Sequence, residues 1–264
     1  MKHSKKLTTF LTMALIPFSS VAFAQGSTAA NLVYIEQVGS SNIVAIEQVG
    51  GGNSVGGTAG TATVAGTGIT TLVPTAASST NYGTITGNTN TVGITQTGDS
   101  NSAQYNIKGN NNVYNSTVTG NSNQTKLNIG DQSSAANLRN TVTETIVGNS
   151  NTVIQQVTGN DITSTLSITG NSNQVTNSLL STKGSVSNTV TGNSNVFNSQ
   201  QVDTAGANGH QLVMSTTGDF NSISTQQQGF NDTILNISTS GSNNTITVRS
   251  SSGAIANPVS AIAR

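Results

Sequence analysis

The sequence predicts an all-β fold: an amyloid-like β-solenoid of stacked strand-turn-strand coils, with a 22-residue period made of two 11-residue half-turns. Three observations lead to this prediction. Asn and Gln recur at a fixed spacing, apolar and polar residues alternate between them, and a short Gly- and Asn-rich turn separates the segments. A fixed short period in a chain rich in Gly, Ser and Asn indicates copies of one small unit stacked on each other.

The Asn and Gln residues follow steps of six and then five positions. The series begins with Asn31, Gln37, Asn42, Gln48 and Asn53, and it resumes at Asn90, Gln96 and Asn101. Partial copies occur at Asn195 and Gln201 and at Asn221 and Gln227. Stacking at a fixed spacing would align equivalent amides, so we expect them to form hydrogen-bonded ladders. The simpler alternative is that Asn only marks turns and Gln only reflects a polar composition.

Alternation of apolar and polar residues follows each Asn of the series. Val92, Ile94 and Gln96 stand two, four and six positions after Asn90, while Thr91 and Thr95 occupy the other parity. Because alternate residues of a strand point to opposite faces, each segment is expected to bury one face. The residues expected to point inward include Val92, Ile94, Leu127, Val153 and Leu166.

A four-residue turn of the type Gly120-Asn121-Ser122-Asn123 separates the expected strands. It recurs at 87–90, 98–101, 109–112, 148–151, 170–173, 192–195 and 218–221. Gly and Asn tolerate the positive φ that tight bends need, and Asn or Ser side chains can bond to the backbone there. Strand and turn together therefore make a flat coil with a thin core.

The pattern divides the chain into five parts. Residues 1–24 are expected to be a secretory signal, with Lys2, Lys5 and Lys6, an apolar run and the Ala22-Phe23-Ala24 cleavage site. Residues 25–53 are the first repeats, 54–80 a Gly-, Ala- and Thr-rich loop or linker, 81–250 the solenoid repeats and 251–264 a tail. Six extra residues around 131–138 and four around 207–210 fall between strands, where a solenoid tolerates insertions.

Composition excludes several classes of function. Without the three signal lysines, six basic residues remain against nine acidic ones, a net charge near −3, so no basic patch for nucleic acid is expected. The chain has no Cys, and only His210 remains outside the signal. Neither a catalytic triad nor a His-based metal site can be assembled from these residues, so we expect a non-enzyme without a cofactor. The apolar run of the signal is too short to span a membrane.

The repeats resemble those of the curlin family, the subunits of bacterial curli fibres. Asn31-x5-Gln37-x4-Asn42-x5-Gln48 has the family's spacing, with Asn in place of its first Ser, and Asn90-x5-Gln96-x4-Asn101 is a second match. The middle of the chain departs from the motif. There the Gln positions hold Ile107, Val118, Ile129, Ile146, Val157, Ile168, Leu179 and Val190, and the Asn positions hold Ile162, Gly184, His210 and Asp232.

The resemblance implies a secreted fibre subunit that polymerises with itself and with a second curlin subunit. It also implies export chaperones and a secretion pore in the outer membrane, and a role in cell adhesion and biofilm matrix. Carboxylates near turns (Asp99, Asp161, Asp203, Asp219 and Asp232) either slow aggregation or are ordinary turn residues.

Two alternatives belong to another class, a soluble solenoid that binds a surface. One is an ice-binding protein, against which we count the lack of a regular two-column array among the outward threonines Thr91, Thr95, Thr141, Thr143, Thr163 and Thr165. The other is a monomeric adhesin, which capped ends would favour.

Overall fold

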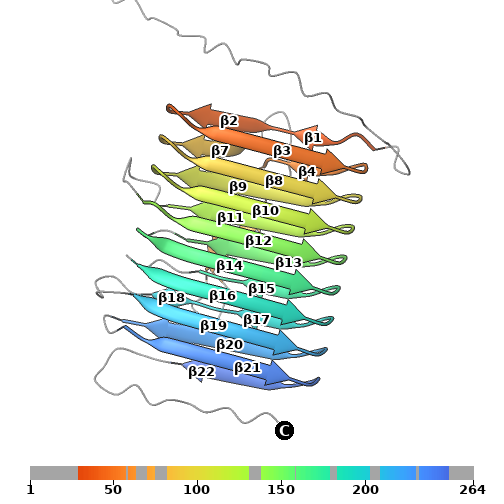
Figure 1. The fold of residues 1–264 in the computed structure, drawn as a ribbon, viewed down its shortest axis with the longest axis vertical. Coiled ribbons are helices and arrows are strands. Elements are labelled where there is room, and N and C mark those ends of the chain that lie inside the picture. Colours follow the sequence, from red (N-terminus) through yellow and green to blue (C-terminus); the bar gives the residue numbers. More distant parts are fainter. Residues whose placement is uncertain are drawn as a thin grey trace, which may run out of the picture.

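The computed structural model describes residues 29–57, 59–63, 70–74, 82–130, 138–157, 159–178, 183–202, 209–229 and 232–249. Within them the chain is all β and forms a β-solenoid, as the sequence predicts (Figure 1). Two parallel sheets run the length of the stack and face each other across a thin core.

The eight-stranded sheet takes one strand from each coil, in the spatial order β3, β8, β10, β12, β14, β16, β19, β21. Each of these strands pairs with the next in parallel register. Their bounds are β3 Ile43–Val49, β8 Thr91–Thr97, β10 Val113–Thr119, β12 Thr141–Val147, β14 Ile162–Thr169, β16 Gly184–Thr191, β19 His210–Thr217 and β21 Ile234–Ser240.

The twelve-stranded sheet forms the opposite side and is broken into shorter strands. Its bounds are β1 Leu32–Val33, β2 Ile35–Val38, β4 Ser54–Val55, β7 Gly83–Thr86, β9 Ser102–Lys108, β11 Gln124–Ile129, β13 Thr152–Gln156, β15 Gln174–Thr176, β17 Val196–Asn198, β18 Gln201–Val202, β20 Ser222–Gln228 and β22 Thr245–Arg249.

The core has the predicted parity. Val92, Ile94, Leu127, Val153 and Leu166 are all buried, as are the apolar residues at the former Gln positions Ile107, Val118, Ile129, Ile146, Val157, Ile168 and Val190. Leu179 lies outside the described residues, as do the proposed signal and the tail. The alternation therefore identifies the buried face of the middle coils correctly.

The register confirms the period and locates its interruptions. Equivalent Asn residues are 22 positions apart in an ordinary coil, as between Asn101 and Asn123. The separation is 28 from Asn123 to Asn151 and 26 from Asn195 to Asn221, as expected for insertions of six and four residues. It is 23 from Asn221 to Asn244, a single extra residue that the sequence analysis missed. The assignment of Asp232 to an Asn position is therefore wrong, because Gln211 pairs with Ile234 and Thr233 follows His210 in that column.

The range 54–80 contains more structure than a loop or linker. Ser54 and Val55 form β4, which pairs with β1 and β9 and continues the solenoid. Strands β5 (Ala59–Thr63) and β6 (Thr70–Pro74) pair antiparallel as a separate hairpin whose backbone lies alongside β9, β11 and β13. Outward-pointing Gln104, Lys126 and Asn128 of β9 and β11 are buried. We infer that the hairpin covers this part of the twelve-stranded sheet.

Candidate functional site

The regular part of the molecule is its turns. Column 1 is defined as the turns that follow the eight-stranded sheet, at 50–53, 98–101, 120–123, 148–151, 170–173, 192–195, 218–221 and 241–244. In each of them the first residue is a Gly with φ between 105 and 133°. A Cβ on Gly148 would lie 1.8 Å from the carbonyl oxygen of Gly170 in the next coil. Only Gly allows both this φ and this approach of two backbones.

The fourth residue of every column 1 turn is an Asn, called the inner Asn here. The Nδ2 of Asn123 donates back to Asn101 Oδ1 at 3.0 Å and forward to Gly148 O at 2.7 Å. Its Oδ1 accepts from the backbone N and the Nδ2 of Asn151, at 3.0 and 3.1 Å. A chain of such Oδ1 contacts runs from Asn31 to Asn244 through Asn53, Asn101, Asn123, Asn151, Asn173, Asn195 and Asn221.

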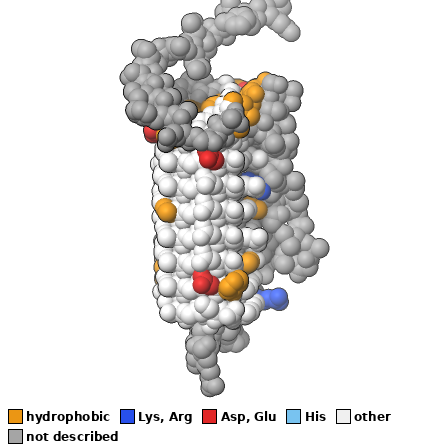
Figure 2. Space-filling model, turned by 90° about the vertical axis from the view of Figure 1, so that its right-hand side faces the viewer, with side chains coloured by type: hydrophobic (Ala, Val, Ile, Leu, Met, Phe, Trp, Pro, Cys, Tyr) orange, Lys and Arg blue, Asp and Glu red, His pale blue; other side chains and the backbone are white. Residues whose placement is uncertain are grey.

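A second ladder runs along the outside of column 1 in the opposite direction. Here the backbone N–H of the second turn residue donates to a side chain of the following coil. Asn121 N donates to Asn149 Oδ1 at 2.7 Å, Asn149 N to Asn171 Oδ1 at 2.8 Å, and Asn193 N to Asp219 Oδ1 at 2.6 Å. Asp99 and Asp219 therefore accept hydrogen bonds inside this ladder. The surface of column 1 shows few charged side chains (Figure 2).

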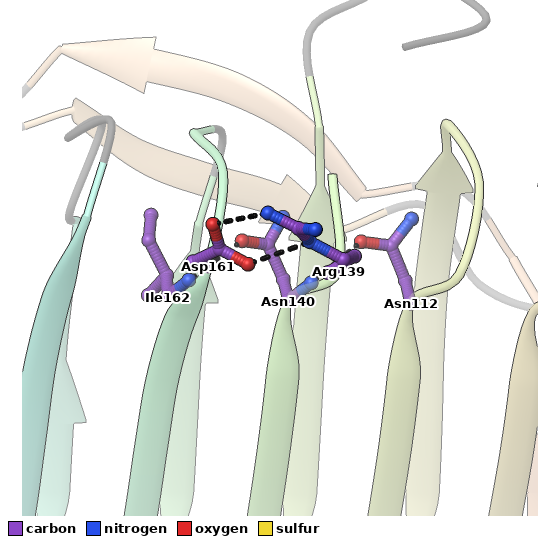
Figure 3. A network of polar contacts seen from close by, with 5 residues as sticks. All are labelled: Asn112, Arg139, Asn140, Asp161 and Ile162. Atoms are coloured by element: carbon purple, nitrogen blue, oxygen red, sulfur yellow. Dashed lines mark hydrogen bonds and ion pairs between the residues drawn. The ribbon is translucent and has the colours of Figure 1, made fainter. Parts of the chain in front are cut away.

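Column 2 is defined as the turns at the opposite edge of the stack; among the residues that the structure describes, it has the four-residue Gly-x-x-Asn turn at 39–42, 87–90 and 109–112. Its inner ladder runs from Asn42 through Asn90 and Asn112 to Asn140. It ends where Asn140 Oδ1 accepts from the backbone N of Ile162 at 3.0 Å, leaving the buried Asn140 Nδ2 without a partner (Figure 3). Beside this end, Arg139 makes two hydrogen bonds of 2.7 and 2.6 Å to the Asp161 carboxylate.

The predicted Gln ladder is present only in fragments. Gln48 Nε2 donates to Gln96 Oε1 at 2.9 Å, and Gln227 Nε2 contacts Gln201 Oε1 at 3.4 Å. The prediction is wrong for Gln37, which is exposed and pairs in register with Ile85 rather than with another amide. Where β-branched residues replace Gln in the next coil, the amide has no equivalent to bond to, so the ladder cannot continue.

The core contains a polar cluster that was not predicted from the sequence. Glu144 of β12 is 1% exposed; its carboxylate accepts hydrogen bonds from Tyr114 Oη at 3.0 Å and from Gln155 Nε2 at 2.6 Å. Ser164 Oγ donates in turn to Gln155 Oε1 at 2.8 Å. The one feature of the sequence that indicates this cluster is an acidic residue, Glu144, at an inward-facing position.

A hydroxyl array lies on the outer face of the eight-stranded sheet, in the two rows next to column 1. One row across the strands is Thr95, Thr117, Thr145, Ser167, Thr189, Ser215 and Ser238, and the next is Thr97, Thr119, Val147, Thr169, Thr191, Thr217 and Ser240. Of the six outward threonines named from the sequence, only Thr95 belongs to these rows, so the array is made mostly of residues that the sequence prediction did not include. The sequence does contain the pattern that indicates this array: the array residues stand one and three positions before the turn Gly, as in Thr117-Val118-Thr119-Gly120.

The two end coils differ from those in between. Val33 of β1 points inward but is 47% exposed, whereas its register partner Val55 in the following coil is fully buried. In the eight-stranded sheet the outermost strands are β3 and β21. Among the described residues no strand pairs with the outer edge of either one, so the described part of the stack has a backbone edge at each end.

Other functional features are absent from the part of the chain that the structure describes. It holds no group of three His, Cys, Asp or Glu residues placed to bind a metal ion. Nor does it contain a helix with the length and apolarity needed to cross a membrane. Comparison of the chain with protein-family models, with curated proteins and with solved structures gives no match.

Proposed function

We propose that this chain is a secreted subunit of an extracellular, curli-type amyloid fibre that grows by stacking of solenoid ends and serves cell adhesion and biofilm matrix. It acts as a structural protein rather than an enzyme. Its partners are further copies of itself and a second subunit of the same kind, with a secretion pore and export chaperones on its way out of the cell.

The polarity of the column 1 ladder carries this proposal. Each inner Asn offers its Oδ1 to the coil that follows it along the chain, as Asn221 does to Asn244. Asn244 therefore presents an acceptor at the C-terminal end, while Asn31 presents the matching donors at the N-terminal end. A second copy stacked head to tail would continue the ladder and the parallel backbone pairing together.

The N-terminal edge can be tested by mutation of β3. Ile43 N donates to Asn90 O, and Gly98 N donates to Val49 O, both at 2.8 Å. Backbone groups of successive strand residues point to opposite sides, so the N–H of Ile46 faces away from β8, toward the open edge. Pro at this position would remove an edge donor while leaving the bonds to β8 in place.

The experiment compares Ile46→Pro with Ile46→Ala in thioflavin-monitored growth on preformed fibres. Both lose the side chain, but only the Pro variant loses the edge donor. We expect Ile46→Ala to elongate fibres, and a small fraction of Ile46→Pro added to wild type to arrest growth by capping ends. Equal growth of the two variants, or absence of fibres from the wild-type chain, would overturn the proposal.

The hydroxyl array favours a second candidate function, binding to ice. Its two rows form a flat grid with spacings of about 4.8 Å between coils and about 6.8 Å along each strand. Hydroxyl and methyl groups repeated on this scale can hold water in an ordered lattice. Thr189→Lys in the array should then abolish inhibition of ice recrystallisation, whereas Thr152→Lys on the other sheet should not. If the wild-type chain leaves ice growth unchanged, this candidate fails without affecting the fibre proposal.

A further inference from the structure

The Glu144 cluster links three neighbouring coils through the core. Tyr114 comes from β10, Glu144 from β12 and Ser164 from β14, all in the eight-stranded sheet, while Gln155 reaches across from β13 of the opposite sheet. Leu166 is the register partner of Glu144 in β14, and Ser116 is its partner in β10. The cluster therefore touches both sheets where the middle coils close on each other.

The surroundings of the Glu144 carboxyl contain no compensating positive charge. The inward-facing residues of the described strands β9 to β15 include no basic side chain, and their only titratable groups besides Glu144 are Tyr105 and Tyr114. Lys108 and Lys126 belong to the outward-facing parity of β9 and β11. A buried carboxylate with hydrogen bonds but no cation remains costly, because its lost hydration is only partly replaced.

We propose that the Glu144 cluster is an acid-favoured latch, in which the middle coils close most stably with the carboxyl protonated and loosen when it loses its proton. The protonated Glu144 carboxyl still has an oxygen that can accept the hydrogen bond from the Tyr114 hydroxyl. Ser116 lies beside the carboxyl and can accept a hydrogen bond from its proton. Acidification of the medium would then promote folding of the exported chain.

How stability changes with pH depends on whether the folded or the unfolded chain binds the Glu144 proton more tightly. Burial raises the pKa of Glu144 from 4.5 to about 7, and the hydrogen bonds that the carboxylate accepts from Tyr114 and Gln155 offset this only in part. The folded chain therefore keeps a proton that the unfolded chain has lost between these values. Its contribution to stability is full below about pH 4.5 and is lost as the pH rises through about 7.

The test is equilibrium unfolding of the full chain as a monomer, followed by far-UV circular dichroism between pH 4.5 and 8. Glu144→Gln is compared with Glu47→Gln, which removes an exposed carboxylate from β3 of the same sheet. We expect the unfolding constant of the wild type and of Glu47→Gln to rise by roughly two orders of magnitude over this range. The Glu144→Gln variant should show little of this rise.

A spectroscopic titration keeps the proposal falsifiable if Glu144→Gln does not fold. The chain labelled with carboxyl-¹³C glutamate should show one resonance that titrates near neutral pH, and Tyr114→Phe should shift its titration to higher pH by removing a donor to the carboxylate. Titration of every glutamate near 4.5 in the folded chain, or an unchanged pH slope in Glu144→Gln, would overturn the latch. Neither result depends on fibre formation, so the fibre proposal would stand or fall separately.

Discussion

The two turn columns hold the same coils together but follow different rules. Column 1 repeats one four-residue turn, and its chain of Asn contacts runs from Asn31 to Asn244. Column 2 keeps that turn in its first three coils, and its Asn ladder stops at the backbone of Ile162. Insertions of six and four residues fall on column 2, yet the strands on either side keep perfect register. One regular edge is therefore enough to set the stacking, which leaves the other edge free to vary.

The largest effect should come from the turn glycines, which have positive φ in column 1 and in the regular turns of column 2. Gly148→Ala places a Cβ 1.8 Å from the Gly170 carbonyl oxygen at a φ of 132°. Because both the conformation and the contact are unfavourable, we expect the free energy of unfolding to fall by roughly 3 kcal/mol or more. Denaturant-induced unfolding of the variant and the wild type measures this loss. Gly184→Ala at the start of β16, at a Gly without positive φ, should cost much less. Similar losses at both sites would show that the turn conformation is not what makes Gly148 necessary.

Removal of one inner Asn from each column should give a smaller, graded difference. Asn151 makes two donor contacts and accepts two more, whereas the side chain of Asn140 only accepts from Ile162 N and leaves its own Nδ2 unpaired. We expect about 2–3 kcal/mol of destabilisation for Asn151→Ala and about 1 kcal/mol for Asn140→Ala. Thermal unfolding of the two variants side by side would show this. An equal loss would mean that the ladder adds nothing beyond the turn itself.

The smallest effect is expected from the ion pair that flanks the end of the column 2 ladder. Arg139 and Asp161 are 2.6 Å apart, but their side chains are 59% and 37% exposed. Water and salt screen such a pair, so Arg139→Gln should change stability less than either Asn substitution does. Unfolding of the wild type and the variant at low and high salt measures what the ion pair contributes to stability. A loss above that of Asn140→Ala would show that charge rather than the amide ladder holds this edge.

The sequence predicts the parts of this fold that depend on periodicity alone. Alternation identifies Val92 and Leu127 as core residues, and the spacing of Asn101 and Asn123 gives the coil length. Prediction from the sequence fails where the environment of a residue is set by its neighbour in the next coil rather than by the residues beside it in the chain. Gln37 has no amide beside it because Ile85 occupies the following coil. The extra residue before Thr233 and the hydrogen bonds of Glu144 likewise become visible only once the strands are in register.

Head-to-tail stacking of the regular column is the central claim, and a designed disulfide tests it most directly. Leu32 follows Asn31 in the first coil and Thr245 follows Asn244 in the last, and both side chains are exposed. In a head-to-tail fibre these positions would face each other at about 4.8 Å, within reach of a disulfide. Fibres of a Leu32→Cys, Thr245→Cys variant, oxidised and run on a non-reducing gel, should give a ladder of covalent multimers, while either single variant should remain monomeric. Covalent dimers from a single variant, or oxidised fibres of the double variant without multimers, would contradict head-to-tail growth.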